Sequence, residues 1–384
     1  MHVLIIANAY PDQKSNLPGI FIEQQAIALK EKEIKIGVIT VELKKLNKIV
    51  KQPFLAKSEE TVYTREDIPV FKKSALNLTP FLHYFPKYYI PLNSLKLFEK
   101  YIEKYGKPQL IHAHFGLWSG YAAMKIHEKY KIPYIITEHT SYFVEKKYNG
   151  YELRAISKAY DKSSAIITVS SALKKEVIKN THNKEVRIIP NMIDTSFFKP
   201  DYSVIKEDMI FSLGNLIKTK GQDILIKAFA LIAPAIPSYK LVIGGDGPEK
   251  ENLIELATQL AIQEKIIFPG NLTRIEIRNY LHKSKCFALP SKFETFGIVY
   301  MEAIACGVPV VATKCGGPED FINQNNGILC ETDNIEEIAH AMKSILMNLN
   351  SYNLTEMHSF VNRNYSKENI SQMLVNLYQE KIKG

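Results

Sequence analysis

Short apolar runs rich in strand-forming residues recur along the chain, and helical or loop patterns separate them. They form two series, one at residues 2–9, 35–40, 109–115, 133–139, 165–170 and 186–191, and one at 209–215, 240–247, 265–270, 286–291, 309–314 and 327–330. Continuous apolar strands that alternate with amphipathic helices indicate parallel sheets covered on both faces. The two series therefore predict an α/β protein with two doubly wound, Rossmann-like domains.

The boundary between the two series is predicted from a polar, aperiodic stretch at residues 191–209. A chain of 384 residues is long for one core and natural for two domains. We expect an N-terminal domain at 1–195, a C-terminal domain at 196–365 and a terminal helix at 366–384. That helix has Ser366 as its N-cap and an apolar stripe, which we expect to pack on the N-terminal domain.

Charge is divided unevenly between the two halves of the chain. Residues 1–195 hold 30 Lys and Arg against 19 Asp and Glu, whereas residues 196–384 hold 19 against 21. This asymmetry favours a polyanionic partner for the first half, and an anionic membrane surface is the partner we expect, without nucleic acid. The alternative is a lysine-rich surface that is merely solvated.

Membrane-spanning, secreted and zinc-binding classes are disfavoured by the sequence. No apolar run approaches the roughly 18–20 residues that span a bilayer, and the N-terminus lacks a basic leader. The four cysteines lie in the last quarter without a C-x-x-C pair. We expect a reduced, cytoplasmic protein, with peripheral contact to the inner face of the cytoplasmic membrane as an extension of that prediction.

The segment from Pro290 to Ala312 carries the strongest functional pattern. Two predicted strands flank it, and a Phe-Gly pair lies between Glu294 and Glu302. Eight residues on a helix amount to two turns plus about 80°, so Glu294 is predicted to precede the helix and Glu302 to lie inside it. The unsatisfied first-turn N–H groups of Phe296, Gly297, Ile298 and Val299 then face a phosphate. The alternative is a first-turn acid and a solvated helical glutamate.

This segment, PS-x-x-E-T-F-G-x-x-x-x-E-A-x-A-x-G-x-P-V-V-A, resembles the signature of the retaining glycosyltransferases of family 4, the group 1 glycosyltransferases of GT-B fold. Segments 189–200, 211–229, 241–253, 266–272 and 316–322 also resemble family segments in the right order. The resemblance implies two α/β domains facing a central cleft, with the donor mainly on the second domain. It also implies metal-independent transfer from a nucleoside-diphosphate sugar by front-face attack.

The resemblance assigns roles in the second domain. Glu302 would hold the ribose, Glu294 the sugar's 3- or 4-hydroxyl, and Lys220 with the 296–299 N–H groups the diphosphate. Asn271 and Leu272 would line the base pocket. Asn215 stands where the family commonly has an Arg, so Lys218 or a basic group of the first domain would have to replace that cation. Gly244 and Gly245 are interpreted as close-packing residues.

Three residues of the first domain complete the predicted site. Gly19 follows the first strand and opens the next helix, so its loop could approach a diphosphate, although a simple helix-start glycine is the alternative. His112 and His114 share one strand face; no Asp or Cys completes a metal set. The resemblance gives His114 a hydrogen bond to the donor sugar and His139 a contact with sugar or acceptor.

The sequence thus predicts a retaining, hexose-transferring enzyme that uses a UDP- or GDP-sugar and no cofactor. Its acceptor would be a sugar or lipid-linked hydroxyl in the synthesis of cell-surface polysaccharide, lipopolysaccharide or glycolipid. The alternatives are a related GT-B enzyme, such as a sugar-nucleotide epimerase or a phosphorylase, and a non-catalytic protein that binds a membrane surface or a sugar nucleotide. Residues 75–107 mix aromatics with lysines, which suits a membrane interface or an ordinary amphipathic helix.

Overall fold

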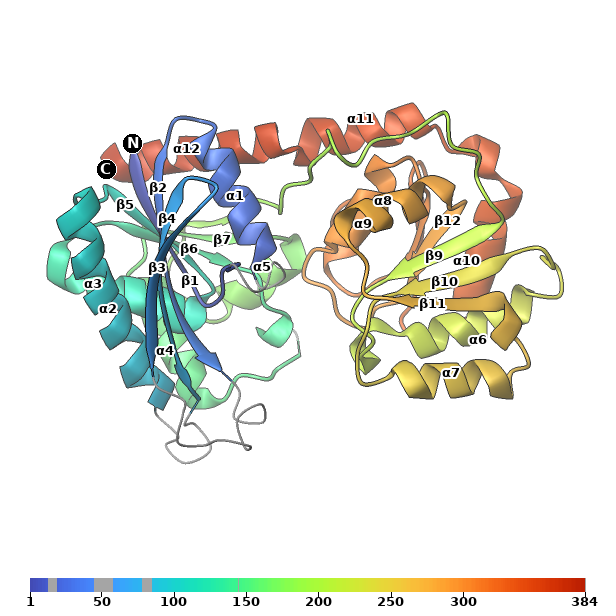
Figure 1. The fold of residues 1–384 in the computed structure, drawn as a ribbon, viewed down its shortest axis with the longest axis horizontal. Helices are drawn as coiled ribbons and strands as arrows, with labels where there is room; N and C mark the ends of the chain where they lie inside the picture. The colour runs from blue at the N-terminus through green and yellow to red at the C-terminus, as the bar shows by residue number, and fades with distance from the viewer. Residues whose placement is uncertain (13–18, 45–57, 78–84, 144, 384) are drawn as a thin grey trace. The chain divides into compact units, whose positions relative to one another are not determined.

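The computed structural model describes residues 1–12, 19–44, 58–77, 85–143 and 145–383, and they form two compact units (Figure 1). Unit 1 comprises Met1–Met192 and Ile370–Gly384, and unit 2 comprises Ile193–Asn369. The division lies three residues before the predicted boundary at 195/196, and the return to unit 1 begins four residues after Ser366. Each unit contains one mainly parallel sheet, so the predicted pair of Rossmann-like domains is confirmed.

Unit 1 is built on a sheet with the strand order β3-β4-β2-β1-β5-β6-β7-β8. The β1–β2, β1–β5, β5–β6, β6–β7, β7–β8 and β2–β4 pairs are parallel. The strands are β1 (His2–Ala7), β2 (Lys35–Lys44), β3 (Glu59–Arg65), β4 (Ile68–Leu76), β5 (Leu110–His114), β6 (Tyr134–Glu138), β7 (Ala165–Thr168) and β8 (Val186–Ile188).

The β3–β4 hairpin at one edge of this sheet was not predicted. β3 pairs antiparallel with β4 and is exposed along most of its length, so its sequence lacks the apolar run of a buried strand. The connecting residues Glu66 and Asp67 have φ values of 50° and 57°. Two consecutive left-handed residues form the type of turn that closes a two-residue hairpin, and here neither is Gly.

The unit 1 helices include one from the end of the chain. They are α1 (Ile20–Lys30), α2 (Phe85–Tyr105), α3 (Tyr121–Tyr130), α4 (Gly150–Asp161), α5 (Ser171–Ile178) and α12 (Lys367–Lys383). In Figure 1, α12 is the red helix beside the blue α1. The Ser366 hydroxyl accepts from the Asn369 N–H (3.3 Å), and the stripe around Leu374 lies in the same core as Ile22. The predicted N-cap and the return to the first domain are confirmed.

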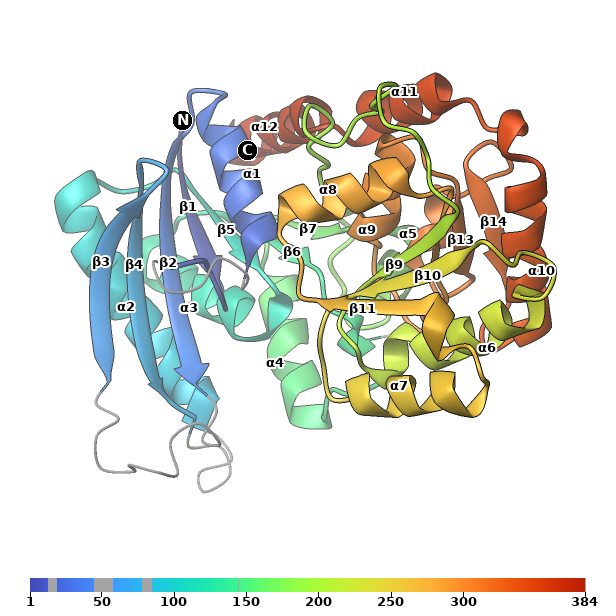
Figure 2. The same cartoon turned by 45° about the vertical axis from the view of Figure 1, so that its right-hand side comes forward.

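Unit 2 is a parallel sheet with the strand order β11-β10-β9-β12-β13-β14. Its strands are β9 (Met209–Leu213), β10 (Lys240–Gly244), β11 (Ile266–Gly270), β12 (Cys286–Leu289), β13 (Val310–Thr313) and β14 (Gly327–Cys330). Its helices are α6 (Gln222–Ile232), α7 (Lys250–Gln259), α8 (Arg274–Lys283), α9 (Ile298–Ala305), α10 (Ile335–Met347) and α11 (Leu354–Tyr365). Figure 2 shows α6, α7 and α10 on one face of this sheet and α8 and α9 on the other.

The order of β9 and β12 at the centre of unit 2 determines where ligands bind. The chain leaves β9 outward to β10 and β11, and it leaves β12 in the opposite direction to β13 and β14. In open parallel sheets, such a switch point leaves a crevice at the carboxyl ends of the strands. Lys220 follows β9 and Glu294 follows β12, so the predicted donor residues lie at this position. Among the described residues, no helix is long and apolar enough to span a membrane.

Candidate functional site

Lys220 and Glu294 form an ion pair at the switch point of unit 2. The Lys220 Nζ lies 2.6 Å from Glu294 Oε2, and the two side chains are 22% and 14% exposed. Lys220 ends a short 3₁₀ turn just before α6, and Glu294 precedes α9, as the sequence predicts. The pair is partly buried but still in contact with solvent, so an anion could bind to the Lys220 ammonium group.

A close approach of two backbone segments brings this pair together. Gly221 has a φ of 69°, and a Cβ on it would overlap the carbonyl oxygen of Pro290. The Lys292 N–H donates to the Thr219 carbonyl (2.8 Å) across the same contact. Because only glycine combines a left-handed φ with this proximity, Gly221 fixes where Lys220 lies.

The backbone of Glu294 is held from its other side as well. Its N–H donates to the Cys315 carbonyl (3.1 Å), and its carbonyl accepts from the Gly317 N–H (2.8 Å). A Cβ on Gly317 would overlap the backbone of Phe296. The resembling segments 290–312 and 316–322 are therefore in direct contact at the predicted donor residues.

At the start of α9, Phe296 can offer a ligand its backbone but not its side chain. The Phe296 ring is buried against Phe321 and Tyr365, with centroid distances of 5.6 and 5.9 Å. Gly297 precedes the helix with a φ of 95°, and the described backbone hydrogen bonds include none donated by Ile298 or Val299. Such first-turn N–H groups carry a partial positive charge that favours an anion.

Glu302 is a partly buried carboxyl group inside α9, about one turn beyond those N–H groups. It has neither a hydrogen bond nor an ion pair among the described residues. Burial raises its pKa from 4.5 to about 7; the nearby Arg274 opposes the shift and Asp194 adds to it. Glu302 is thus an unpartnered acceptor that changes charge near neutral pH.

Two arginines of α8 were missed in the sequence, and the first of them, Arg274, acts electrostatically on Glu302. Arg274 lies 3.4 Å from the Asp194 carboxylate, and its guanidinium carbon is 4.7 Å from the Phe197 ring centroid. The Arg278 guanidinium lies 4.4 Å from the same ring, and its buried Nε has no partner among the described residues. Their spacing of four residues at the start of a helix was the available signal.

The remaining predicted donor residues of unit 2 differ in exposure. Asn215 and Asn271 are exposed, while the Leu272 side chain packs over Gly244. A Cβ on Gly245 would overlap the Gly214 carbonyl oxygen, so the interpretation of Gly244 and Gly245 as close-packing residues is confirmed.

The histidines of unit 1 form a buried stack at the ends of β5 and β6. The rings of His112 and His114 are 4.5 Å apart, which confirms that they share a strand face. His112 is hydrogen-bonded to Tyr378 of α12 and to Thr137, each at 2.7 Å. His114 Nδ1 lies 3.0 Å from His139 Nε2. Burial lowers the pKa values of His112 and His139 to about 3 and that of His114 well below 6.5.

The hydrogen bond between His114 and His139 restricts what the pair offers to a ligand. A neutral imidazole has one N–H and one acceptor nitrogen. The shared bond uses one donor and one acceptor, so His114 Nε2 and His139 Nδ1 must present one of each. Both atoms are buried without a partner among the described residues. His114 has no exposed surface in this structure, and His139 is partly exposed.

Glu138, which the sequence analysis passed over, organises the backbone around these histidines. Its carboxylate accepts from the N–H groups of Gly116, His139 and Thr140 and from the Tyr160 hydroxyl, at 2.7–3.1 Å. Burial raises the pKa of Glu138, and these four donors oppose that shift. The glutamate thereby joins the segment after β5 to the one after β6.

Gly19 is required by local packing in unit 1. It precedes α1 with a φ of 77°, and a Cβ on it would overlap the Ala9 carbonyl oxygen. The helix-start alternative therefore accounts for this glycine without a ligand. The loop before it, residues 13–18, lies outside the described residues.

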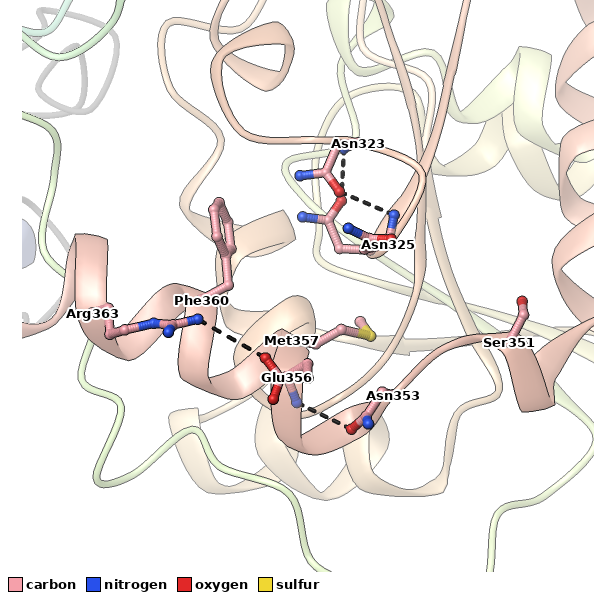
Figure 3. Close-up of a pocket in the computed structure, with 9 residues that line it drawn as sticks. Asn323, Asn325, Ser351, Asn353, Glu356, Met357, Phe360 and Arg363 are labelled. Carbon is pink, nitrogen blue, oxygen red and sulfur yellow. Dashed lines mark hydrogen bonds and ion pairs between the residues drawn. The ribbon is translucent and has the colours of Figure 1, made fainter.

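A separate hollow of about 370 Å³ in unit 2 contains none of the predicted site residues (Figure 3). It lies between the turn before β14 and helix α11. Within the part of the chain that the structure describes, no cluster of three or more His, Cys, Asp or Glu residues could hold a metal ion.

Two family models match the chain. The model described as Glycosyl transferases group 1 matches residues 196–366, and the one described as Glycosyltransferase Family 4 matches residues 55–197. Together they extend over most of both units.

Curated relatives and solved structures agree with these matches. The putative teichuronic acid biosynthesis glycosyltransferase TuaC of Bacillus subtilis is 27% identical over 371 residues, 89% of this chain and 88% of TuaC. An uncharacterised glycosyltransferase of Methanocaldococcus jannaschii is 32% identical over 235 residues, 56% of this chain but only 60% of the relative. Anabaena HepE, solved with UDP, has a TM-score of 0.76 at 18% identity and covers 99% of this chain and 100% of HepE. HepE was also solved with UDP-glucose.

Proposed function

Since the chain belongs to the group 1 glycosyltransferases of the family 4 type and has the GT-B fold, we propose that it transfers a hexose from a UDP- or GDP-sugar to an acceptor hydroxyl with retention of anomeric configuration. The observation that carries this proposal is the Lys220–Glu294 pair at the switch point beside the free N–H groups of α9. It combines a cation, a helix start and a hydroxyl acceptor in one place.

Each of the donor-binding groups of unit 2 binds a different part of the nucleotide sugar. Lys220 and the N–H groups of Gly297 to Val299 bind the diphosphate, because both present positive charge that does not reorganise during reaction. Glu294 accepts from a sugar hydroxyl, and Glu302 accepts from the ribose. Because the Phe296 ring is buried, that residue contributes only backbone. The backbone of Asn271 and Leu272 contacts the base.

Arg274 is the cation of unit 2 that we propose in place of the arginine missing at Asn215. Its charge opposes the rise in the pKa of Glu302, which supports a guanidinium near the donor groups, whereas the Lys218 side chain is exposed. Planar guanidinium groups bind phosphate oxygens in a bidentate manner. The partner Asp194 would be exchanged for the ligand.

The transfer step needs no protein nucleophile. The acceptor oxygen attacks the anomeric carbon, the bond from that carbon to the phosphate oxygen breaks on the same face, and the phosphate oxygen takes the acceptor's proton. Because Glu294 forms an ion pair with Lys220, it accepts a hydrogen bond from a sugar hydroxyl and does not act as the nucleophile. Lys220 stabilises the negative charge that develops on the leaving diphosphate. No metal ion enters this scheme.

The histidine pair of unit 1 is proposed to bind hydroxyl groups of a sugar ligand. One donor and one acceptor nitrogen match a pair of hydroxyls, each of which can donate and accept. Because His114 is fully buried, its contact requires a local rearrangement of the covering residues, and Phe21 and Phe115 pack directly on His139.

Polysaccharide or glycolipid synthesis is the process we propose, and TuaC supports it by its name. We further propose that unit 1 contacts an anionic membrane through α2. This helix exposes 68% of Tyr88 and 53% of Leu92, and Lys87 lies against the Tyr151 ring. Sedimentation with vesicles should give stronger binding to anionic than to neutral lipid, and Tyr88→Ala should weaken it. Equal binding to both lipids would contradict the membrane proposal.

A panel of UDP-, GDP- and ADP-sugars tests the enzymatic proposal. A nucleotide sugar that binds the native state raises the melting temperature by mass action. We expect a shift with a UDP- or GDP-sugar and slow release of the nucleoside diphosphate from the same compound. Glu294→Gln should lose the release and keep the fold. The proposal fails if no nucleotide sugar shifts the melting temperature.

A further inference from the structure

The hollow beside α11 is a second, independent place where unit 2 could bind a ligand. Its volume of about 370 Å³ lies at the lower end of the range for small-molecule sites. The turn before β14 supplies one wall and α11 the other, as Figure 3 shows. The lining residues are Asn323, Asn325, Asn326, Ser351, Asn353, Glu356, Met357, Phe360 and Arg363.

Local hydrogen bonds use only part of the polar groups in this lining. Asn326 donates to the Phe321 carbonyl (2.9 Å), and Asn353 Oδ1 caps α11 at the Glu356 N–H (3.1 Å). The backbone N–H of Asn325 donates to Asn323 Oδ1 (3.0 Å), whereas its side-chain amide has no hydrogen bond among the described residues, and the Nδ2 of Asn353 likewise remains for a ligand. Glu356 and Arg363 form only a long, exposed ion pair of 3.9 Å.

The chemistry of the lining selects a neutral, hydroxyl-rich ligand. Its one carboxylate and one guanidinium balance, so it favours neither an anion nor a cation. The asparagine amides can both donate to and accept from adjacent hydroxyls, while the Glu356 carboxylate accepts and the Arg363 guanidinium donates. The Phe360 ring, which rises from α11 toward the Asn323 turn in Figure 3, adds an apolar wall for the C–H face of a sugar ring.

A chain of aromatic rings connects this hollow with the start of α9. Phe360 packs on Tyr365 at 5.8 Å, and Tyr365 packs on Phe296 at 5.9 Å. Phe321, whose carbonyl accepts from Asn326 of the hollow, also packs on Phe296. A ligand in the hollow would therefore contact Phe360, which is linked to Phe296 through the ring of Tyr365.

We propose that this hollow is a saccharide-binding site, distinct from the donor site, that holds one or two neutral sugar rings. The binding itself is independent of the proposed function. Its use, to retain a glycan chain during transfer, rests on that function.

Saturation-transfer NMR with maltose, cellobiose and N,N′-diacetylchitobiose tests the proposal on the full chain. We expect at least one disaccharide to bind. The Asn325→Ala and Arg363→Ala double variant should weaken its binding at least tenfold, and both replaced side chains are exposed, so the fold should persist. Asn252→Ala, an exposed asparagine on α7, is the matched control and should change the affinity less than twofold.

Two further results distinguish this site from the donor site. Binding that persists in Lys220→Ala places the saccharide outside the donor groups. Failure of every disaccharide to bind, or undiminished binding in the double variant, would overturn the saccharide site. A protein that binds the disaccharide but releases no nucleoside diphosphate would overturn the proposed function alone.

Discussion

The two units provide polar groups of opposite character for their ligands. In unit 2, Lys220, Glu294 and Glu302 are charged or chargeable and partly exposed. In unit 1, His112 and His114 are buried and His139 is partly exposed, and desolvation lowers the pKa values of all three, which keeps them neutral. Histidine is the usual side chain that titrates near pH 7, yet here a glutamate does so. The comparison teaches that burial moves the pKa of an acid toward neutral pH and that of a base away from it, so a desolvated glutamate can titrate where desolvated histidines do not.

The largest effect is expected from removing the Lys220 charge in unit 2. Lys220→Ala should lower the transfer rate about 100- to 1,000-fold, because one preorganised stabiliser of a developing charge is worth about that much. Lys218→Ala is the matched control, since its side chain is exposed two residues away. Initial rates with a saturating donor, with circular dichroism for folding, provide the measurement. An equal loss of transfer rate in Lys218→Ala would show that Lys220 is not the specific catalytic cation.

The backbone geometry that positions Lys220 can be tested separately from the charge of its side chain. Gly221→Ala adds both backbone strain and an overlap with Pro290, whereas Gly270→Ala adds strain alone, because no atom lies within 4 Å of its Cβ. We expect unfolding free energies about 3 kcal/mol and about 1 kcal/mol lower, respectively. Urea denaturation measures both. Equal losses would show that the approach to Pro290 does not fix the Lys220 turn.

Unit 1 has a buried carboxyl group of its own, Glu138, that accepts four hydrogen bonds. Glu138→Gln turns an acceptor oxygen into a donor among three backbone N–H groups, so the unfolding free energy should fall by about 2–3 kcal/mol. Glu103→Gln, an exposed position on α2, should change it by less than about 0.5 kcal/mol. If urea denaturation finds the two variants alike, Glu138 does not hold the two segments together.

The smallest expected effect is on pH dependence. Glu302 loses its proton as the pH rises through about 7, and a carboxylate accepts hydroxyl hydrogen bonds more strongly than the neutral acid. Donor affinity should therefore rise about fivefold between pH 6 and 8. Glu302→Gln should flatten the profile measured by calorimetry, while His114→Ala should retain the slope. A slope lost only in His114→Ala would reverse the comparison.

The same titration affects stability with the opposite sign. The folded-state pKa of Glu302 lies above its ordinary value of 4.5. The folded protein therefore retains a proton that the unfolded chain has lost, and stability from this group declines as the pH rises from about 4.5 to about 7. Binding of the donor and folding thus favour different protonation states of one carboxyl group.

The sequence predicted the fold well wherever strands are buried on both faces. The twelve predicted strands all correspond to strands of the structure, because apolar β-branched runs are a direct signature of parallel sheets. The edge strand β3 was missed because it is exposed, and the largely buried β4 was missed because Lys72 and Lys73 interrupt its apolar run. Lys220, Glu294 and Glu302 could be placed relative to their helices from local spacing alone.

The contacts that complete the site could not be predicted from spacing. Glu138 accepts from residues on two separate loops, and Arg274 meets Asp194 across 80 positions. The desolvation of a single polar side chain also has no local signature, so the neutrality of His114 and the raised pKa of Glu302 required the packed structure.

The return of α12 to unit 1 bears on how the protein is made. Ile370, Leu374 and Tyr378 lie in one core with residues of β1 and α1, and Tyr378 is hydrogen-bonded to His112. Domains generally fold as units during synthesis, N-terminal first. Here the first unit must wait until the whole of the second has emerged from the ribosome, and until then its incomplete core needs protection from aggregation.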